Sequence, residues 1–168
     1  MKFVNLADRP DMVSVVAHWY FEEWGRTQKD NSYEKTLAKV QSQMNKDRIP
    51  LHILAVEDDG HILGVAQLKY HEMSIYPERT YWLGGVFVST DARGKGVGLA
   101  LVQKIIEIAR SFGVDKLSLQ TEKFDGGIYS KCGFEPVEKV TYIGIDVLVM
   151  EKNLKEVERA PSMLSSHH

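Results

Sequence analysis

The sequence predicts a mixed α/β domain in which most strands of the sheet are antiparallel and one βαβ unit is parallel. Two apolar runs, 51–57 and 62–70, flank the turn residues Asp59 and Gly60 and indicate an antiparallel hairpin. A strand at 81–88, a helix at 96–112 and a strand at 116–121 indicate the parallel unit, with a right-handed crossover. The length of 168 residues suits one domain. We expect this domain to span 1–155 and a C-terminal tail to span 156–168, whose closing SSHH resembles an expression tag.

Two amphipathic helices are expected after a short N-terminal strand at 2–6. Apolar side chains recur at helical spacing in the segment 7–25, which ends at a glycine, as helices commonly do. The segment 31–46 repeats the pattern. Asn31 and Glu34 at its start resemble a capping box, which marks the first turn of a helix.

The remaining elements follow the hairpin in a regular order. A polar loop, 71–80, leads into the strand at 81–88, and Gly113 closes the long helix that follows. Next come a short helix at 126–132 and two strands at 135–142 and 145–151. The predicted order is therefore β-α-α-β-β-β-α-β-α-β-β, without a repeat, linker or low-complexity block.

Charge and composition exclude several classes of protein. The 21 basic and 23 acidic residues give a net charge of -2, which argues against a nucleic-acid-binding protein. Cys132 is the single cysteine, so an internal disulfide is impossible, and no residue spacing is typical of a zinc site. No apolar stretch approaches the roughly 18 residues that span a membrane, and the N-terminus lacks the apolar region of a secretory signal. We therefore expect a cytoplasmic protein without a bound metal.

The stretch VFVSTDARGKGVGLA, residues 86–100, places three glycines in five positions at the start of a helix. Glycine inside a regular element costs about 0.5–1 kcal/mol relative to alanine, so this density needs a reason. The first amides of a helix have no intrahelical partner and attract anions, which makes a phosphate site the best explanation. Two known phosphate motifs fail, because Lys95 is followed by Gly96 instead of Ser or Thr, and Leu99 stands where a dinucleotide motif needs glycine.

What remains is Arg93-x-x-Gly96-x-Gly98 between a strand and an amphipathic helix, and this pattern resembles the acetyl-CoA signature of the GCN5-related N-acetyltransferase (GNAT) superfamily. The downstream segment IYSKCGF is similar to the Tyr-x-x-x-Gly-Phe segment of that family, through Tyr129, Gly133 and Phe134. The resemblance implies that acetyl-CoA is the co-substrate and that its pyrophosphate lies against the glycine-rich turn. The residues it assigns to the cofactor are Val86, Phe87, Val88, Arg93, Gly94, Lys95, Gly96, Val97, Gly98 and Leu99.

The resemblance also implies a splayed pair of strands. The strand at 81–88 and the strand at 116–121 would diverge, and the pantetheine arm of the cofactor would lie between them. Gly84 and Gly85 fit a bulge that opens the sheet at this point. Main-chain groups of the first strand would then bind the pantetheine amides and polarise the thioester carbonyl.

Tyr129 is placed by the family pattern as the acid that protonates the departing thiolate, and a tyrosine phenol is neutral at working pH. The alternative is that Tyr129 only packs the short helix onto the sheet. Cys132 has no recognisable His and acid partners in the sequence, so we interpret it as structural and not as an acyl-enzyme nucleophile.

The general base is less well defined. An amine with a pKa near ~10.4 is mostly protonated at neutral pH and must lose a proton before it attacks. Many relatives place a glutamate on the strand before the glycine-rich turn, where this chain has Gly84. Glu72 is our first candidate because its loop should face the acceptor, with His71 second and Glu122 as a further possibility. A chain of water molecules without a dedicated base is an equal competitor.

The sequence thus predicts an acetyl-CoA-dependent N-acetyltransferase that transfers acetyl to a primary amine by direct attack in a ternary complex. The acceptor would be a small-molecule amine or a protein N-terminus, and a homodimer is possible because relatives are often dimers. No nucleic acid or membrane partner is expected. The alternative is a non-catalytic acyl-CoA-binding or regulatory domain that kept the pocket but lost turnover.

Overall fold

The computed structural model describes residues 1–155, in which seven strands form one mixed sheet. The order of strands across the sheet is β1-β2-β3-β4-β5-β7-β6, and every neighbouring pair is antiparallel except β4 and β5. The elements are β1 (Lys2–Asn5), α1 (Val13–Tyr20), α2 (Tyr33–Gln41), β2 (Leu51–Val56), β3 (Ile62–Tyr70), β4 (Tyr81–Val88), α3 (Val97–Ser111), β5 (Lys116–Thr121), α4 (Gly127–Lys131), β6 (Glu135–Tyr142) and β7 (Ile145–Asn153). The predicted fold class and order of elements are confirmed. The expected tail at 156–168 lies outside the described residues.

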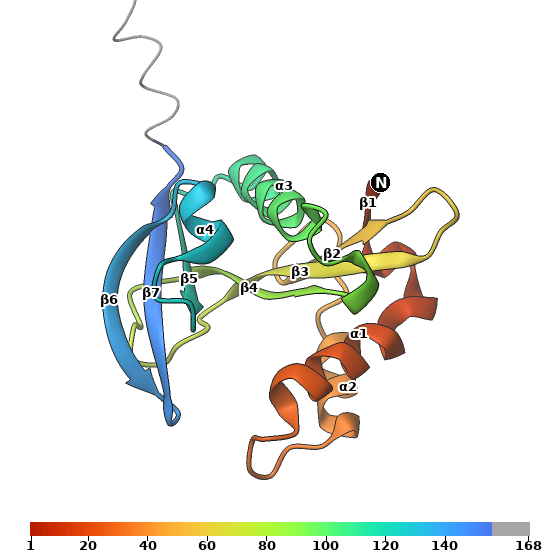
Figure 1. The fold of residues 1–168 in the computed structure, drawn as a ribbon, viewed down its shortest axis with the longest axis horizontal. Coiled ribbons are helices and arrows are strands. Elements are labelled where there is room, and N and C mark those ends of the chain that lie inside the picture. Colours follow the sequence, from red (N-terminus) through yellow and green to blue (C-terminus); the bar gives the residue numbers. More distant parts are fainter. Residues whose placement is uncertain (156–168) are drawn as a thin grey trace, which may run out of the picture.

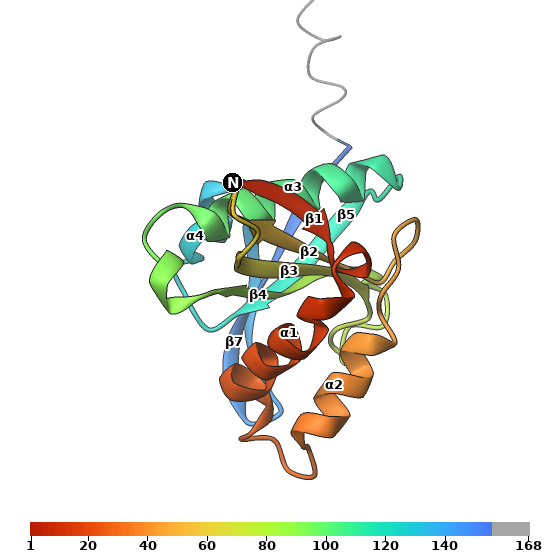
Figure 2. The ribbon, with the colours of Figure 1, turned by 90° about the vertical axis from the view of Figure 1, so that its right-hand side faces the viewer.

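The sheet is covered by helices on both faces (Figures 1 and 2). Helix α3 presents Leu101, Val102 and Ile105 to one face, and all three side chains are fully buried. Helices α1 and α2 cover the other face, where Val16 of α1 packs with Leu54 and other apolar residues of the sheet. Full burial of a Val, Leu or Ile side chain contributes about 1.5–3 kcal/mol. These two apolar layers hold β2, β3 and β4 in a fixed position between the helices.

The N-terminal helical region is less regular than the sequence suggests. The segment expected as one helix, 7–25, contains short 3-10 turns before α1 and a π-helical turn, Phe21–Gly25, after it. The cap of α2 is Ser32, whose Oγ accepts a hydrogen bond from the Lys35 amide at 3.1 Å. The expected cap at Asn31 is therefore wrong by one residue. Asn31 instead donates to the Gly25 carbonyl at 3.2 Å and closes the preceding turn.

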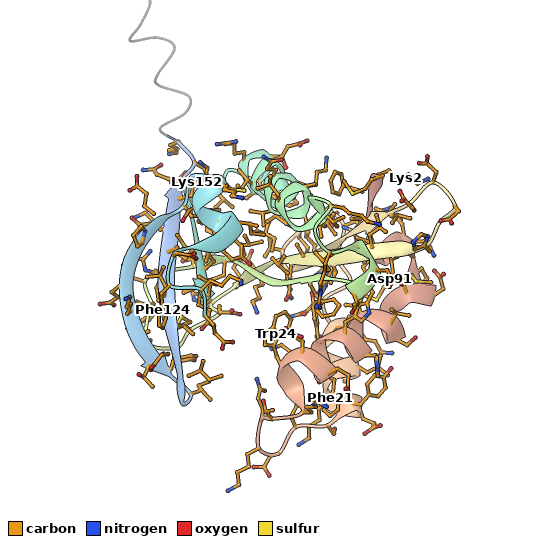
Figure 3. All side chains as sticks on the ribbon, in the orientation of Figure 1. Lys2, Phe21, Trp24, Asp91, Phe124 and Lys152 are labelled. Carbon is orange, nitrogen blue, oxygen red and sulfur yellow. The ribbon has the colours of Figure 1, made fainter. Side chains whose placement is uncertain are left out.

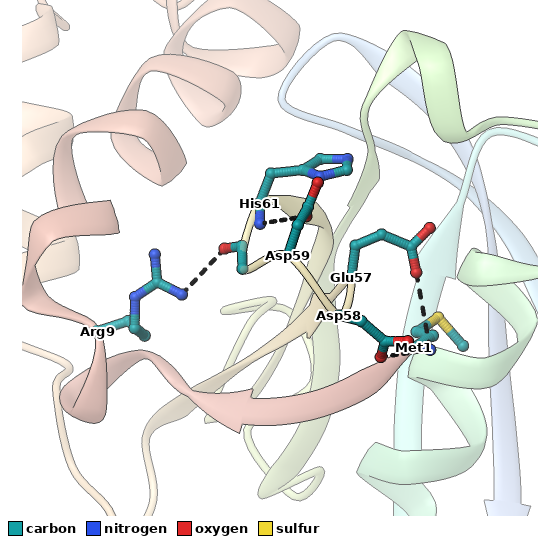
Figure 4. A network of polar contacts seen from close by, with 7 residues as sticks. Met1, Arg9, Glu57, Asp58, Asp59 and His61 are labelled. Carbon is teal, nitrogen blue, oxygen red and sulfur yellow. Dashed lines mark hydrogen bonds and ion pairs between the residues drawn. The ribbon is translucent and has the colours of Figure 1, made fainter.

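The turn between β2 and β3 is tied to the N-terminal segment by a polar network at the molecular surface (Figure 4). Arg9 donates to the Gly60 carbonyl at 3.1 Å, and the His61 amide donates to Asp59 at 3.1 Å. The Met1 amino group lies 3.7 Å from the Glu57 carboxylate. Exposed ion pairs contribute only about 0–1 kcal/mol each, so this network shapes the turn more than it stabilises the fold.

Candidate active site

Strands β4 and β5 are neighbours in the sheet, yet among the described residues they pair only at Trp82 and Ser118. In the pairing of β3 with β4, Val65 faces Phe87 and Gln67 faces Gly84, so two residues of β4 lie opposite Ala66 alone. Such an extra residue is a β-bulge, which bends its strand away from the neighbouring strand. The β4–β5 pair is therefore splayed, as predicted. The bulge residues are Gly85 and Val86, one position along the strand from the predicted pair Gly84 and Gly85.

The glycine-rich turn lies at the end of β4, where Arg93, Gly94, Lys95 and Gly96 are all exposed. Gly94 and Gly96 have φ angles of 78° and 81°, in the left-handed region that favours glycine, and a Cβ at either would have no atom within 4 Å. Within residues 1–155, no main-chain carbonyl accepts a hydrogen bond from the amides of 94–99. The turn thus presents a row of free amides at the N-terminus of α3, which suits an anion.

The side chains of the turn have more varied roles than its main chain. Arg93 Nε donates to the Val88 carbonyl at 3.0 Å, and its guanidinium lies 5.5 Å from the centre of the Phe87 ring. Arg93 therefore fastens the turn to the end of β4. The Val97 side chain is buried in the core. A Cβ at Gly98 would lie 3.3 Å from Ile128 Cδ1, so this glycine lets α3 approach α4.

Helix α4 brings Tyr129 to the site. Its ring lies edge-on to Phe134 with 6.3 Å between ring centres, and burial raises the pKa of its phenol to about 12, with smaller contributions from Cys132 and Glu72. The phenol is therefore protonated over the whole ordinary pH range. An open hollow beside this helix adjoins the first turn of α3 through Ile128. Its lining residues are Lys123, Phe124, Asp125, Gly127, Ile128 and Lys131.

Glu72 lies between β4 and β5. Its side chain is only 15% exposed, and its Oε2 accepts a hydrogen bond from Gln120 Nε2 of β5 at 3.0 Å. Its Oε1 lies 3.5 Å from the position of a Cβ on Gly84 of β4. Lys69 at the end of β3 forms an ion pair with the same carboxylate. The Glu72 charge contributes to the raised pKa of Tyr129, so the two predicted catalytic side chains are within electrostatic reach of each other.

The other candidate bases lie elsewhere. His71 is exposed with a φ of 48°, and its ring stacks on Tyr70 with 6.3 Å between ring centres. Glu122 is exposed just beyond the end of β5. Of the three residues that the sequence left open, only Glu72 enters the gap between the strands.

Aromatic side chains from α1 and the π-helical turn border the other side of the gap. The Tyr20 hydroxyl donates to the Gly85 carbonyl at 2.8 Å, and burial, together with the Glu72 charge, raises the pKa of that phenol. The Trp24 ring lies 5.7 Å from the Tyr20 ring and is 37% exposed. Figure 3 shows Trp24 at the end of the α1 layer and Phe124 on the β6–β7 half of the molecule.

Residues 13–134 match the family model described as the acetyltransferase (GNAT) family, which is more than half of the chain. The chain belongs to the GNAT family. The match includes the glycine-rich turn, the splayed strands and Tyr129, and it confirms the family that the sequence pattern indicated.

Relatives of this GNAT chain align with only part of their length. It is 33% identical over 107 residues to a probable glucosamine 6-phosphate N-acetyltransferase 2 of Oryza sativa subsp. japonica, covering 55% of the chain and 63% of that relative. It is 32% identical over 85 residues to an L-methionine sulfoximine/L-methionine sulfone acetyltransferase of Pseudomonas paraeruginosa, covering 45% of the chain and 49% of that relative.

A solved structure shares the GNAT fold over most of the chain. The crystal structure of an aminoglycoside 6'-N-acetyltransferase complexed with coenzyme A aligns with a TM-score of 0.69 and 16% identity, covering 92% of this chain and 97% of that one. At this level of identity the likeness shows a shared fold. Within residues 1–155 of the GNAT chain, no helix is long and apolar enough to cross a membrane, and no group of three or more His, Cys, Asp or Glu side chains is arranged to hold a metal ion.

Sequence reasoning did not assign Lys69, Gln120 or His52 to the site. Lys69 and Gln120 contact Glu72, Tyr20 binds the bulge, and His52 lies behind Tyr20 with 5.8 Å between ring centres. Lys69, Gln120 and His52 are single polar residues in strands, and no motif surrounds them. A weak signal exists for His52 and Lys69 alone, because alternation along β2 and β3 places them on the same face of the sheet as the buried Leu54 and Val65.

His52 is only 1% exposed, and neither ring nitrogen has a hydrogen-bond partner within the described residues. Burial lowers its pKa to about 3, and the charge of Lys69 adds to this effect. The folded protein therefore keeps His52 neutral at pH values where the unfolded chain, with an ordinary pKa of 6.5, binds a proton. Stability from this group is complete above pH 6.5 and is lost progressively as the pH falls toward 3.

We expect the wild-type protein to lose about 2 kcal/mol of unfolding free energy between pH 7 and pH 5 through His52 alone. His52→Gln removes the titrating group, so its unfolding free energy should fall by correspondingly less over that range, whatever its value at pH 7. Urea unfolding at several pH values measures both slopes. Equal slopes for the two proteins would show that His52 is protonated in the folded state as readily as in the unfolded chain.

Proposed function

We propose that this GNAT chain is an N-acetyltransferase that moves an acetyl group from acetyl-CoA to a primary amine by direct attack within a ternary complex. The observation that carries the proposal is the row of free amides from Gly94 to Leu99, which adjoins the gap between β4 and β5. Open space around Gly94 and Gly96 leaves room for a bulky diphosphate at those amides. The partial charge of the N-terminus of α3 and the cations Arg93 and Lys95 favour the same ligand.

Acetyl-CoA supplies a thioester whose carbonyl carbon forms the new bond with the amine nitrogen while the bond to sulfur breaks. In the proposed assignment, main-chain groups of Val86, Phe87 and Val88 bind the pantetheine arm and polarise the thioester carbonyl. Glu72 takes the proton of the acceptor amine, directly or through water. Tyr129, which keeps its proton because its pKa is about 12, donates it to the departing sulfur.

The acceptor amine is proposed to bind next to the bulge of β4, between Glu72 and the aromatic pair Tyr20 and Trp24. The names of the two curated relatives give glucosamine 6-phosphate, and L-methionine sulfoximine or sulfone, as their substrates. For this chain we propose a small primary amine or a protein N-terminus, which a carboxylate beside aromatic rings would attract in its cationic form. We propose that the enzyme acts in the cytoplasm.

The test is release of free thiol from acetyl-CoA in the presence of a polyamine, an amino sugar, free amino acids and a peptide with a free N-terminus. We expect thiol release that requires one of these amines, together with an acetylated product seen by mass spectrometry. Tight binding of coenzyme A without amine-dependent release across this panel would instead favour a non-catalytic acyl-CoA-binding domain.

A further inference from the structure

The Lys69–Glu72 ion pair is the least exposed charged pair near the gap between β4 and β5. The two side chains are 17% and 15% exposed, respectively. By contrast, the Lys104–Glu107 pair, which has the same spacing in sequence, lies on the surface of α3 with exposures of 31% and 71%. A pair that is mostly removed from water is held by stronger electrostatic forces than a solvated one.

The pair occupies the space beside the bulge of β4. A Cβ at Gly84 would lie 2.8 Å from Lys69 Cε and 3.2 Å from Lys69 Nζ. Because Gly84 has no side chain, Lys69 can cross the face of β4 and reach the carboxylate. Gln120 holds the second carboxylate oxygen from β5. The Glu72 carboxylate is thus fixed between the two splayed strands from both sides.

Other titratable groups around this pair come from several of the elements packed against it. His52 of β2 is neutral, because burial and then Lys69 hold its pKa at about 3. Tyr20 of α1 and Tyr129 of α4 are protonated, since burial raises the pKa of both phenols and Glu72 adds to the effect. The charge of Lys39 of α2 also lowers the pKa of His52. Within residues 1–155, Lys69 is the cation that forms an ion pair with Glu72.

We propose that Lys69 is the positioning residue of this site, which holds the Glu72 carboxylate in the gap and, through its charge, sets the pH range in which the site releases the acceptor amine from its proton. This inference rests on the proposed acetyl transfer and adds a residue that neither the family pattern nor the sequence singled out.

The physical reason is that a cation opposes the addition of a proton to any group beside it. The Glu72 carboxylate is already paired with the Lys69 ammonium group. An acceptor that enters as an ammonium ion is therefore the second positive charge beside that one carboxylate. The repulsion between the two cations favours loss of the acceptor's proton, which passes by way of the Glu72 carboxylate to bulk water. The neutral amine that remains attacks the thioester. Without Lys69, the acceptor would retain its proton to higher pH.

The experiment compares Lys69→Met, Lys69→Arg and the matched control Lys104→Met, using the best amine from the acceptor panel. For Lys69→Met we expect the acid limb of the kcat profile to move up by about one pH unit or more, with kcat lowered about tenfold below that limb. Lys69→Arg keeps the charge and should restore the wild-type limb, and Lys104→Met should match the wild type. The Kd for coenzyme A should be unchanged in all three. If Lys69→Met does not fold, Lys69→Gln takes its place.

A second measurement, independent of activity, tests the pair itself. Thermal unfolding of Lys69→Met, Glu72→Gln and the double variant should be strongly non-additive, because each single variant leaves one partner without its counter-charge. Additive effects would overturn the proposal, as would an active Lys69→Met variant whose kcat profile has the wild-type acid limb. A wild-type protein that acetylates none of the amines would instead contradict the proposed function, and the role of Lys69 would be rejected with it.

Discussion

Gly96→Asp should raise the Kd for coenzyme A by about 10²–10³-fold, because it places a negative charge among the amides that are proposed to bind a diphosphate. Juxtaposed like charges cost several kcal/mol at a binding site, which corresponds to a loss of affinity of this size. Position 96 is exposed, and a new Cβ there would meet no atom within 4 Å. The substitution therefore acts on the ligand and not on the packing of the protein. Isothermal titration with coenzyme A measures the effect.

The matched control is Gly96→Asn, which has nearly the same shape without the charge. Gly96 has a φ of 81°, and Asn and Asp are the side chains that tolerate this left-handed conformation best. Both variants should therefore lose a similar, small amount of stability, and Asn should weaken binding far less than Asp. Equal affinities for the wild-type protein and Gly96→Asp would remove the glycine-rich turn from the binding site.

Tyr129→Phe should lower kcat by about 10²–10⁴-fold and leave the Kd for coenzyme A nearly unchanged, if the phenol is the acid that protonates the leaving sulfur. The substitution keeps the ring and its edge-on contact with Phe134, so only the hydroxyl is lost. Because the pKa of Tyr129 is about 12, the wild-type kcat profile should show no alkaline limb from this group below about pH 10. Steady-state kinetics across this pH range measure both effects.

Tyr33→Phe is the control for the loss of a tyrosine hydroxyl away from the site, because that hydroxyl donates to the Ser14 carbonyl between α2 and α1 and has no other hydrogen-bond partner within residues 1–155. It should retain the wild-type kcat. If Tyr129→Phe also turned over at the wild-type rate, the role of Tyr129 would reduce to packing α4 onto the sheet.

The fold could be read from the sequence because its signals are local. Apolar alternation, a turn at Asp59–Gly60 and a glycine-rich junction each lie within a few residues, and the strand at 116–121 has the predicted bounds. The exceptions lie where two signals compete. Asn31 and Ser32 can both cap a helix. Ser32 is the cap in the structure, and the Asn31 side chain instead donates a hydrogen bond to the Gly25 carbonyl.

The site could be predicted only where a motif marks it. Glu72 and His71 are neighbours in an irregular loop, where the backbone of His71 is left-handed and its side chain is exposed, whereas the Glu72 side chain is mostly buried. Lys69 and Gln120 contact Glu72 from two different strands, and Gln120 lies 48 residues away from it along the chain. Such contacts depend on how β3, β4 and β5 are placed in space, which no short stretch of sequence records.

The free amides of the glycine-rich turn have a consequence for selectivity. Main-chain N–H groups bind a diphosphate through its charge and shape, and they make no contact with the acyl group at the other end of the ligand. Choice among acetyl, longer acyl chains or none would then fall to the far end of the gap, where the bulge, Tyr129 and Glu72 lie. The pantetheine arm of the donor would separate the diphosphate site from the site that selects the acyl group. Substitutions in the glycine-rich turn should therefore leave the choice of acyl group unchanged, and substitutions at the far end of the gap should leave recognition of the diphosphate unchanged.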